Sequence, residues 1–235
     1  MRRTRASARS AASRTPLTST AAKAAPKRRP PLRRTQESRS KAAREKLLNA
    51  TLEVLRDRGY SGLTTKEVAV RAGFSNGALM HHYSTKADLV IAAGAHIYDQ
   101  HIANGRKMAM SAAAKADPLK AFIADCEDVY LGSSFIPTIE LMVAARTDPL
   151  MNAPFDAFMQ NYRKTMNEIW LQTFLRAGYS KAHASFTMMS TLFMIRGMGI
   201  NSIWQKDMTY YRRMLREWTD VAESKCLQDA KIDMR

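Results

Sequence analysis

Apolar side chains recur with helical spacing over most of this chain after residue 40. Between residues 47 and 55 they fall three, four and seven positions apart, which places them on one face of a helix. The members of this stripe are Leu47, Leu48, Thr51, Leu52, Val54 and Leu55. Glycines, prolines and Asp-Pro pairs separate similar stretches further along the chain. The pattern predicts an all-α fold.

Local start and stop signals give the bounds of these helices. The first is expected to end at Gly59, and Thr64 with Glu67 three positions later has the form of a capping box for a second helix at 65–72. Gly73 favours a left-handed turn, and Ser75 is a suitable N-cap for a third helix that reaches about residue 83. Lys86 begins a fourth helix. Further helices are predicted at 118–132, 137–147, 154–177, 181–204 and 210–228.

The second and third predicted helices have the shape of a helix-turn-helix. Two short helices around a glycine turn place one helix in the major groove of DNA. The third helix carries small or polar residues, and Leu79 is expected to face inward. Gly77 costs a helix about 1 kcal/mol relative to alanine, and a close approach of the backbone to DNA would explain it. An ordinary helical hairpin within a bundle is the alternative.

Residues 44–92, above all the run TTKEVAVRAGFSNGALMHHYSTKADL from Thr64 to Leu89, closely resemble the N-terminal domain of TetR-family transcriptional regulators. The resemblance implies base contacts from the third helix and phosphate contacts from His82 and Lys86. Met80 departs from the family, which usually has an aromatic residue there, so its phosphate contact is expected to weaken or to move to His81. The candidate DNA-binding residues are Thr64, Thr65, Ser75, Asn76, Gly77, Ala78, Met80, His81, His82 and Lys86.

The net charge of +16 lies mainly at the start of the chain. The first 40 residues hold 12 basic residues and one acid, a net charge of +11, so only +5 falls on the rest. Residues 1–37 contain too few large apolar residues to offset the entropy of ordering, and we predict a disordered basic arm. Attraction of the arm to DNA, an organelle-targeting segment and a solvated tail without function all remain open.

The remainder of the chain is nearly neutral, with 17 basic and 15 acidic residues between 91 and 235. The resemblance implies a small-molecule pocket here and a homodimer formed through 181–204 and 210–228. Methionines are numerous in this part, and such flexible side chains suit an adaptable cavity for a hydrophobic effector. Ordinary core packing is the alternative for each of them: Met142, Met151, Met159, Met166, Met188, Met189, Met194 and Met198.

Two further features of this part call for an interpretation. Arg146 and Arg196 lie in apolar stretches, so each is expected to meet an acidic ligand group or a partner such as Glu140 or Asp148. The Gly197-Met198-Gly199 run lacks the third glycine and the preceding strand of a nucleotide-binding motif. It is better explained by close approach of helices, and it suits a dimer surface together with Ile195, Met198, Ile203 and Trp204.

Enzyme signatures are missing from the sequence, which has no GxSxG, P-loop or HExxH motif. Acidic neighbours disfavour the thiolate form of Cys126, so it is a poor nucleophile. No cofactor, metal site or membrane span is expected. The cysteine content suits the reducing cytoplasm, and DNA binding would associate the protein with the nucleoid. We predict three parts: a basic arm (1–37), a helix-turn-helix DNA-binding domain (38–85) and a helical effector-binding and dimerisation domain (86–235).

These predictions together describe a dimeric transcriptional regulator, a repressor that a small molecule releases from a palindromic operator. The alternative is a constitutive or architectural DNA-binding protein that has no effector. The two differ in whether any metabolite changes the affinity for the preferred DNA.

Overall fold

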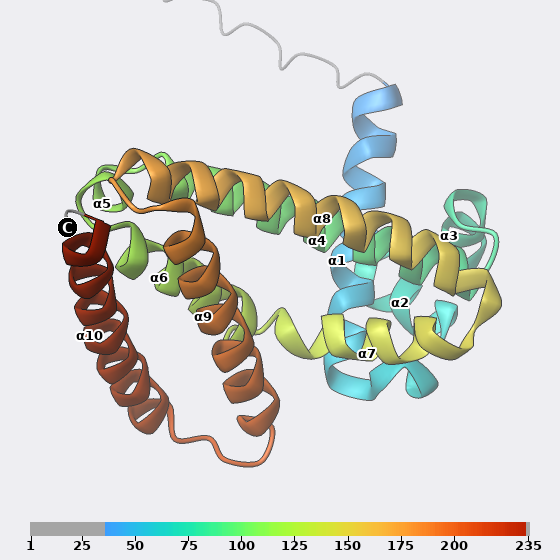
Figure 1. Ribbon diagram of the computed structural model, residues 1–235. Helices are drawn as coiled ribbons and strands as arrows, with labels where there is room; N and C mark the ends of the chain where they lie inside the picture. Colours follow the sequence, from blue (N-terminus) through green and yellow to red (C-terminus); the bar gives the residue numbers. More distant parts are fainter. Residues whose placement is uncertain (1–35, 234–235) are drawn as a thin grey trace, which may run out of the picture. The chain divides into compact units, whose positions relative to one another are not determined.

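The computed structural model describes residues 36–233, with side chains described for residues 36–224. Over this range the chain folds into ten α-helices without a strand (Figure 1), which confirms the predicted all-α class. The helices are α1 (Gln36–Gly62), α2 (Thr65–Ala72), α3 (Asn76–His82), α4 (Lys86–Ala109), α5 (Ala112–Ala116), α6 (Pro118–Tyr130), α7 (Phe135–Thr147), α8 (Pro149–Arg176), α9 (Lys181–Asn201) and α10 (Met208–Asp233). All but the last two residues of the predicted arm lie outside the described residues.

The first four helices form where the sequence predicted them. Gly59 interrupts α1 with a left-handed backbone (φ 67°), although one more turn follows before α1 ends. The bounds of α2 are those predicted, and Ser75 caps α3. Lys86 is the first residue of α4, preceded by Thr85 as its cap.

Three helix starts were predicted wrongly. The last helix, α10, begins at Met208 rather than at 210, and the other two errors arose because proline is compatible with the first turn of a helix. Pro149 occupies the first turn of α8, where a missing N–H costs nothing, and the Asp148 carboxylate accepts a hydrogen bond from the Leu150 N–H at 2.9 Å. Pro154, the predicted start, therefore lies inside α8. Pro137 likewise lies in the first turn of α7 rather than beginning it. The short α5 was not predicted.

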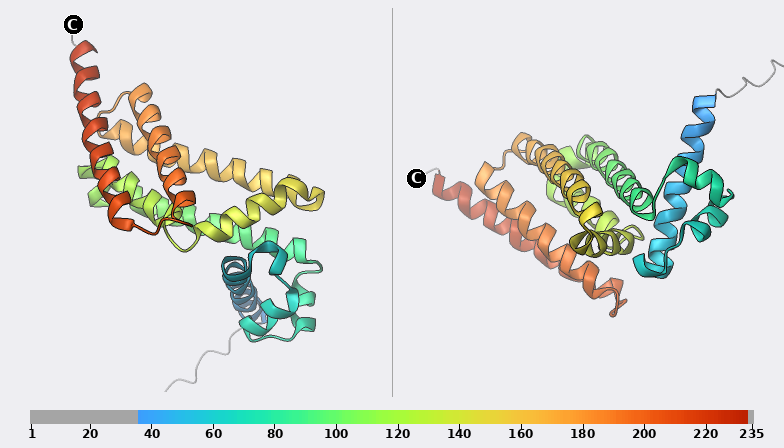
Figure 2. Two further views of the ribbon diagram at one scale, coloured as in Figure 1. Left: turned by 90° about the horizontal axis from the view of Figure 1, so that it is seen from below. Right: turned by 90° about the vertical axis from the view of Figure 1, so that its right-hand side faces the viewer.

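Two large clusters of buried side chains, and a small third one formed by Ile97, Tyr98 and Tyr162, hold the described part together. The first joins α1, α2, α3 and the start of α4 to α7 and the start of α8, with Leu47, Leu79 and Leu141 fully buried. The second surrounds Trp170 and Phe174 and joins α5, α6, α8, α9 and α10. The long helices α4 and α8 lie side by side and pass through both regions (Figures 1 and 2). The predicted division at residue 85 stays a prediction.

Within the described range, no helix is long and apolar enough to span a membrane.

Candidate nucleic-acid interface and internal cavity

Hydrogen bonds fix the starts of α2 and α3 and the turn that joins the two helices. The Thr64 hydroxyl accepts a hydrogen bond from the Glu67 N–H at 3.2 Å, and the Ser75 hydroxyl accepts one from the Ala78 N–H at 3.1 Å. Between these caps, Gly73 adopts a left-handed conformation with φ 77°. Both helices therefore begin at residues whose side chains satisfy free backbone donors. The turn itself is held by the Phe74 N–H, which donates a hydrogen bond to the Ala69 carbonyl at 2.8 Å.

Ion pairs attach α2 to α1. The Arg71 guanidinium lies 2.6 Å from the Asp57 carboxylate and 3.4 Å from that of Glu67, and Arg58 lies 3.6 Å from Glu67. Hydrogen bonds from Arg71 and Arg56 hold the pKa of Asp57 below its usual value. Since Glu67 is engaged with arginines, the predicted return half of the capping box, from Glu67 to the Thr64 backbone, is not formed.

The outer surface of α3 carries small and polar residues together with one methionine. Leu79 is fully buried, as predicted, and anchors the helix against the core. A Cβ atom added to Gly77 would meet nothing nearer than the Ser75 hydroxyl, at 4.0 Å, so packing within the chain does not require glycine there. The exposed residues of this helix are Asn76, Gly77, Met80 and His81. Such a surface lets another molecule approach the backbone closely.

His82 lies half-buried at the end of α3. Burial, followed by the charges of Arg44 and His81, lowers the pKa of His82 below its usual 6.5. His82 is therefore mainly neutral at pH 7 in the free protein. A phosphate next to the ring would favour the charged form and raise this pKa.

Side chains of α4 and α7 form hydrogen bonds with the backbone of Tyr60, near the end of α1. The Lys86 ammonium of α4 donates a hydrogen bond to the Tyr60 carbonyl at 2.6 Å and lies 4.2 Å from the centre of the Tyr60 ring. The Glu140 carboxylate of α7 accepts a hydrogen bond from the Tyr60 N–H at 2.8 Å. Tyr60 thus connects the helix-turn-helix region to both α4 and α7.

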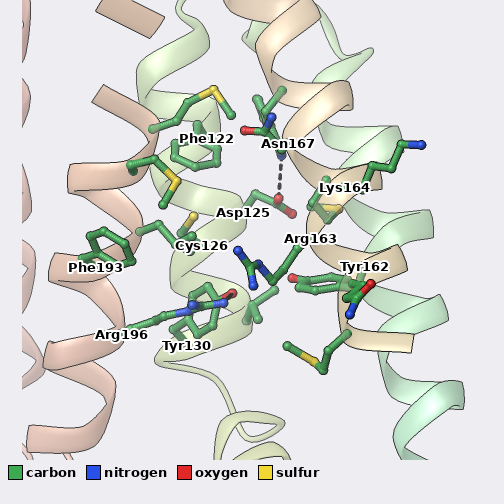
Figure 3. Close-up of a pocket in the computed structure, with 18 residues that line it drawn as sticks. Phe122, Asp125, Cys126, Tyr130, Tyr162, Arg163, Lys164, Asn167, Phe193 and Arg196 are labelled. Atoms are coloured by element: carbon green, nitrogen blue, oxygen red, sulfur yellow. Dashed lines mark hydrogen bonds between the residues drawn. The ribbon is translucent and has the colours of Figure 1, made fainter. Parts of the chain in front are cut away.

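A cavity of about 810 Å³ lies among α6, α8 and α9 (Figure 3). Its wall is mostly aromatic and aliphatic, and four of the methionines proposed from the sequence as cavity residues contribute to it: Met159, Met166, Met188 and Met189. Ligand sites in proteins typically combine such an apolar wall with a few placed polar groups. The volume is sufficient for a small organic molecule.

Two polar groups of the cavity have defined positions. The Arg196 guanidinium donates a hydrogen bond to the Tyr130 hydroxyl at 3.0 Å and lies 5.0 Å from the centre of that ring. Asp125 is only 4% exposed, and its carboxylate accepts a hydrogen bond from the Trp170 indole at 2.8 Å, the dashed line in Figure 3. Burial raises the pKa of Asp125 to about 6.

Comparisons with known proteins agree with this geometry. The family model described as "Bacterial regulatory proteins, tetR family" matches residues 47–93, which include the whole helix-turn-helix. The HTH-type transcriptional regulator CymR of Pseudomonas putida is 29% identical over 195 residues, which cover 83% of this chain and 96% of CymR. Residues 47–93 therefore match the TetR family, and the chain over most of its length is similar to an HTH-type transcriptional regulator.

Solved structures show that this chain shares its fold with distant proteins. A TetR transcription regulator from Haloarcula marismortui has a TM-score of 0.63 at 18% identity, covering 78% of this chain and 98% of the other. A protein from Saccharomonospora viridis, in complex with choline, has a TM-score of 0.62 at 16% identity, covering 78% and 96%. At these identities the likeness concerns the fold alone.

The ten predicted DNA-binding residues all lie on α2, α3, their caps or the first residue of α4. Six are exposed: Thr64, Ser75, Asn76, Gly77, Met80 and His81. Four are half-buried: Thr65, Ala78, His82 and Lys86. Their contacts with DNA stay a prediction.

The interpretation of the two arginines in apolar stretches was partly wrong. Arg146 is exposed on α7, so it needs no buried partner. Arg196 is half-buried, but its partner is Tyr130 rather than a carboxylate. The two proposed acidic partners have other contacts, because Glu140 binds the Tyr60 backbone and Asp148 caps α8.

The residues grouped around Gly197-Met198-Gly199 do not share one surface. Ile195, Met198 and Gly199 are buried, and a Cβ atom on Gly199 would collide with the Tyr130 carbonyl and the Phe135 ring. They serve the core and not a dimer surface, so this part of the prediction was wrong. Ile203 and Trp204 are exposed, as the dimer interpretation requires.

Sequence reasoning missed the links formed by long-range contacts. Tyr60 and Glu140 are 80 positions apart, and Asp125 and Trp170 are 45 apart. No local motif marks such pairs. The only usable signal was that Glu140 and Asp125 are acids within apolar stretches, where a partner is expected.

Proposed function

We propose that this protein is a dimeric repressor of the TetR family whose two α3 helices bind the halves of a palindromic operator, and that a small molecule in the cavity among α6, α8 and α9 releases it. The observation that carries the proposal is the geometry of α3. Leu79 anchors this helix while its small, polar residues remain exposed, and caps fix its orientation relative to α2. A helix held in this way suits the major groove.

The residues around α3 divide into two roles in this proposal. Ser75, Asn76, Gly77 and Ala78 face the bases. The Ser75 oxygen already accepts from the Ala78 N–H, which leaves the hydroxyl proton free to be donated. The phosphate-contacting residues are Thr64, Thr65, Met80, His81, His82 and Lys86. Phosphate contacts position the protein, and base contacts select the sequence.

Lys86 has a double role in this proposal. One of its three N–H donors binds the Tyr60 carbonyl, and the others remain available to a phosphate at the start of α4. Its replacement would weaken DNA binding and loosen the end of α1 together. His82 is the cleaner test of phosphate binding.

The dimer interface is proposed to centre on α9. Met189, Phe193 and Ile200 are 39%, 61% and 53% exposed, and their spacing of four and seven places them on one face of the helix. Gly197 lies on the same face with open space beyond its Cα. The exposed side chains of α10 are mostly charged and suit the rim of an interface: Arg212, Arg213, Arg216, Glu217 and Asp220.

A chain of contacts connects the cavity to the helix-turn-helix. The Tyr130 ring, in the cavity wall, packs edge-on against the Phe135 ring at 5.6 Å between centres. Phe135 begins α7, and Glu140 of α7 binds the Tyr60 backbone at the end of α1. A ligand that favours one position of α7 would therefore shift the population of DNA-binding conformations. The choline complex of the Saccharomonospora viridis protein supports a small-molecule site in this fold.

Selection of bound sequences from random duplex DNA tests the proposal. The full chain is expected to enrich a palindrome, after which a panel of metabolites is screened for release of the selected duplex. Failure to enrich any palindrome would contradict dimeric, sequence-specific binding. Tight binding that no metabolite changes would favour the constitutive regulator without an effector.

A further inference from the structure

The ionisable side chains that line the cavity are mostly cationic. Arg163, Lys164 and Arg196 contribute positive charge, and Asp125 is the acid among the lining residues. In Figure 3, Lys164 points away from the cavity, whereas Arg163 extends from α8 toward α6. The charge that a ligand meets inside the cavity is therefore set mainly by Arg163, Arg196 and Asp125.

Arg196 is held in position but not neutralised. Its guanidinium is half-buried, bonds the Tyr130 hydroxyl and stacks over that ring. Within the described part of the chain, no carboxylate forms an ion pair with it. Only one of the five guanidinium N–H donors is used by Tyr130, so several remain for a ligand. An arginine fixed in this way is pre-organised to bind a planar anion through two hydrogen bonds.

Tyr130 adds to the donors at this end of the cavity. Its hydroxyl accepts a hydrogen bond from Arg196, and Tyr162 lines the same cavity. Burial raises the pKa of both tyrosines, so they stay protonated at physiological pH. The group that Arg196 and the two tyrosines surround is thus expected to accept hydrogen bonds rather than donate them.

Asp125 offers hydrogen-bond acceptors, so the part of a ligand that lies beside it is expected to donate a hydrogen bond. This residue lies five positions before Tyr130 on α6, a separation of about 7.5 Å along the helix axis. Its buried carboxylate accepts a hydrogen bond from the Trp170 indole and keeps further acceptor capacity toward the cavity. Apolar side chains lie around both polar ends, among them Phe122, Leu192 and Phe193. The apolar wall between the two polar ends suits an apolar body on the ligand.

We propose that the effector is an organic carboxylate with a compact apolar body, whose carboxylate is bound by Arg196 beside Tyr130. A hydrogen-bond donor on its far side, such as a hydroxyl, would meet Asp125. This inference rests on the proposed function, because it identifies the chemistry of the effector site. A cationic ligand is disfavoured since the two arginines would repel it, and Asp125 already accepts from Trp170.

Matched probes that share a phenyl group test the charge preference. Phenylacetate, phenylacetamide and benzyltrimethylammonium are titrated against the full chain by calorimetry, and the thermal midpoint of unfolding is recorded in parallel. Phenylacetate is expected to bind at least about tenfold more tightly than the amide, the difference typical of one charge-assisted hydrogen bond. Equal binding of acid and amide, tighter binding of the cation, or no binding of phenylacetate overturns the inference.

Variants locate the preference at Arg196. Arg196→Gln is expected to abolish the difference between phenylacetate and phenylacetamide, and Tyr130→Phe to reduce it while retaining the ring. Arg176→Gln, on the exposed end of α8, is the control and leaves it unchanged. If the folded Arg196→Gln and Tyr130→Phe proteins still prefer phenylacetate over phenylacetamide as strongly as the wild type, then Arg196 does not bind the carboxylate.

The DNA assay separates this inference from the proposed function. Phenylacetate that binds through Arg196 without releasing the selected duplex supports the ligand chemistry and contradicts effector release. Release of the duplex by an amide or a cation alone supports the proposed function and contradicts the carboxylate assignment.

Discussion

At the scale of single residues, the positions that could be predicted are those whose role is local. Thr64, Gly73 and Ser75 satisfy or redirect backbone groups within three residues, so the sequence alone indicates their function. Tyr60 and Asp125 owe their roles to contacts with residues far along the chain. Their surroundings could not be inferred before the helices were packed.

Asp125 should make the stability of the protein depend on pH. Its pKa is 3.8 in an unfolded chain and about 6 in the fold, so between these values the native state binds more protons than the unfolded state. The free energy of unfolding should then fall as the pH rises through this window and stay constant above it. The difference of about two pKa units corresponds to a cost of about 3 kcal/mol at neutral pH.

Asp125→Asn tests this prediction by denaturant unfolding at several pH values. The amide removes the buried charge and can still accept from Trp170, so the variant is expected to be more stable than the wild type at pH 7.5, by up to about 3 kcal/mol. Asp220→Asn, at an exposed position of α10, serves as the control. If Asp125→Asn loses stability between pH 4 and neutral pH as the wild type does, then a group other than Asp125 causes the pH dependence of the free energy of unfolding.

At the scale of helices, caps and apolar spacing determined most of the fold. The bounds of α2 and the starts of α4, α6 and α9 follow from local signals such as Thr85, Pro118 and Ser180. The start of α8 was misjudged because Pro149 and Pro154 carry the same signal, and only packing decides between them. The inward and outward faces of α9 could not be separated in advance, since that helix is apolar nearly all around.

The exposed face of α9 yields a prediction about assembly. Ile200→Asp should weaken the dimer at least about tenfold, because a charge would be desolvated at the proposed interface. Val143→Asp is a matched control, since Val143 is 54% exposed on α7 and Ile200 is 53% exposed. Sedimentation over a range of concentrations measures both. Dimers equally stable in the two variants would place the interface elsewhere.

At the scale of the whole molecule, composition alone does not indicate where the positive charge lies or which helices form the cavity. Most of the +16 net charge belongs to the first 40 residues, whereas residues 41–90, which contain the helix-turn-helix, hold eight basic and five acidic residues. The cavity is built from three helices, with lining residues between 122 and 196. Its methionines could be anticipated as a group, but which of them line it depends on the packing of α6, α8 and α9.

The basic arm yields a prediction about salt dependence. If its cations meet phosphates, removal of residues 1–35 should reduce the slope of log affinity against log salt by about 0.9 for each phosphate that the arm neutralises. The deletion leaves α1 intact, since that helix begins at Gln36. Fluorescence anisotropy on one duplex at several salt concentrations gives both slopes, and identical slopes would exclude a role of the arm in DNA binding.

The most direct test of the central claim is a comparison of the DNA sequences selected by the wild type and by Asn76→Ala. Asn76 is exposed on α3 and contributes no packing to the core. We predict that both proteins enrich a palindrome with the same half-site spacing, but that the variant loses the base preference at one position in each half-site. Identical base preferences in the two pools, or no palindrome in either, would contradict the account of α3 as the helix that reads DNA.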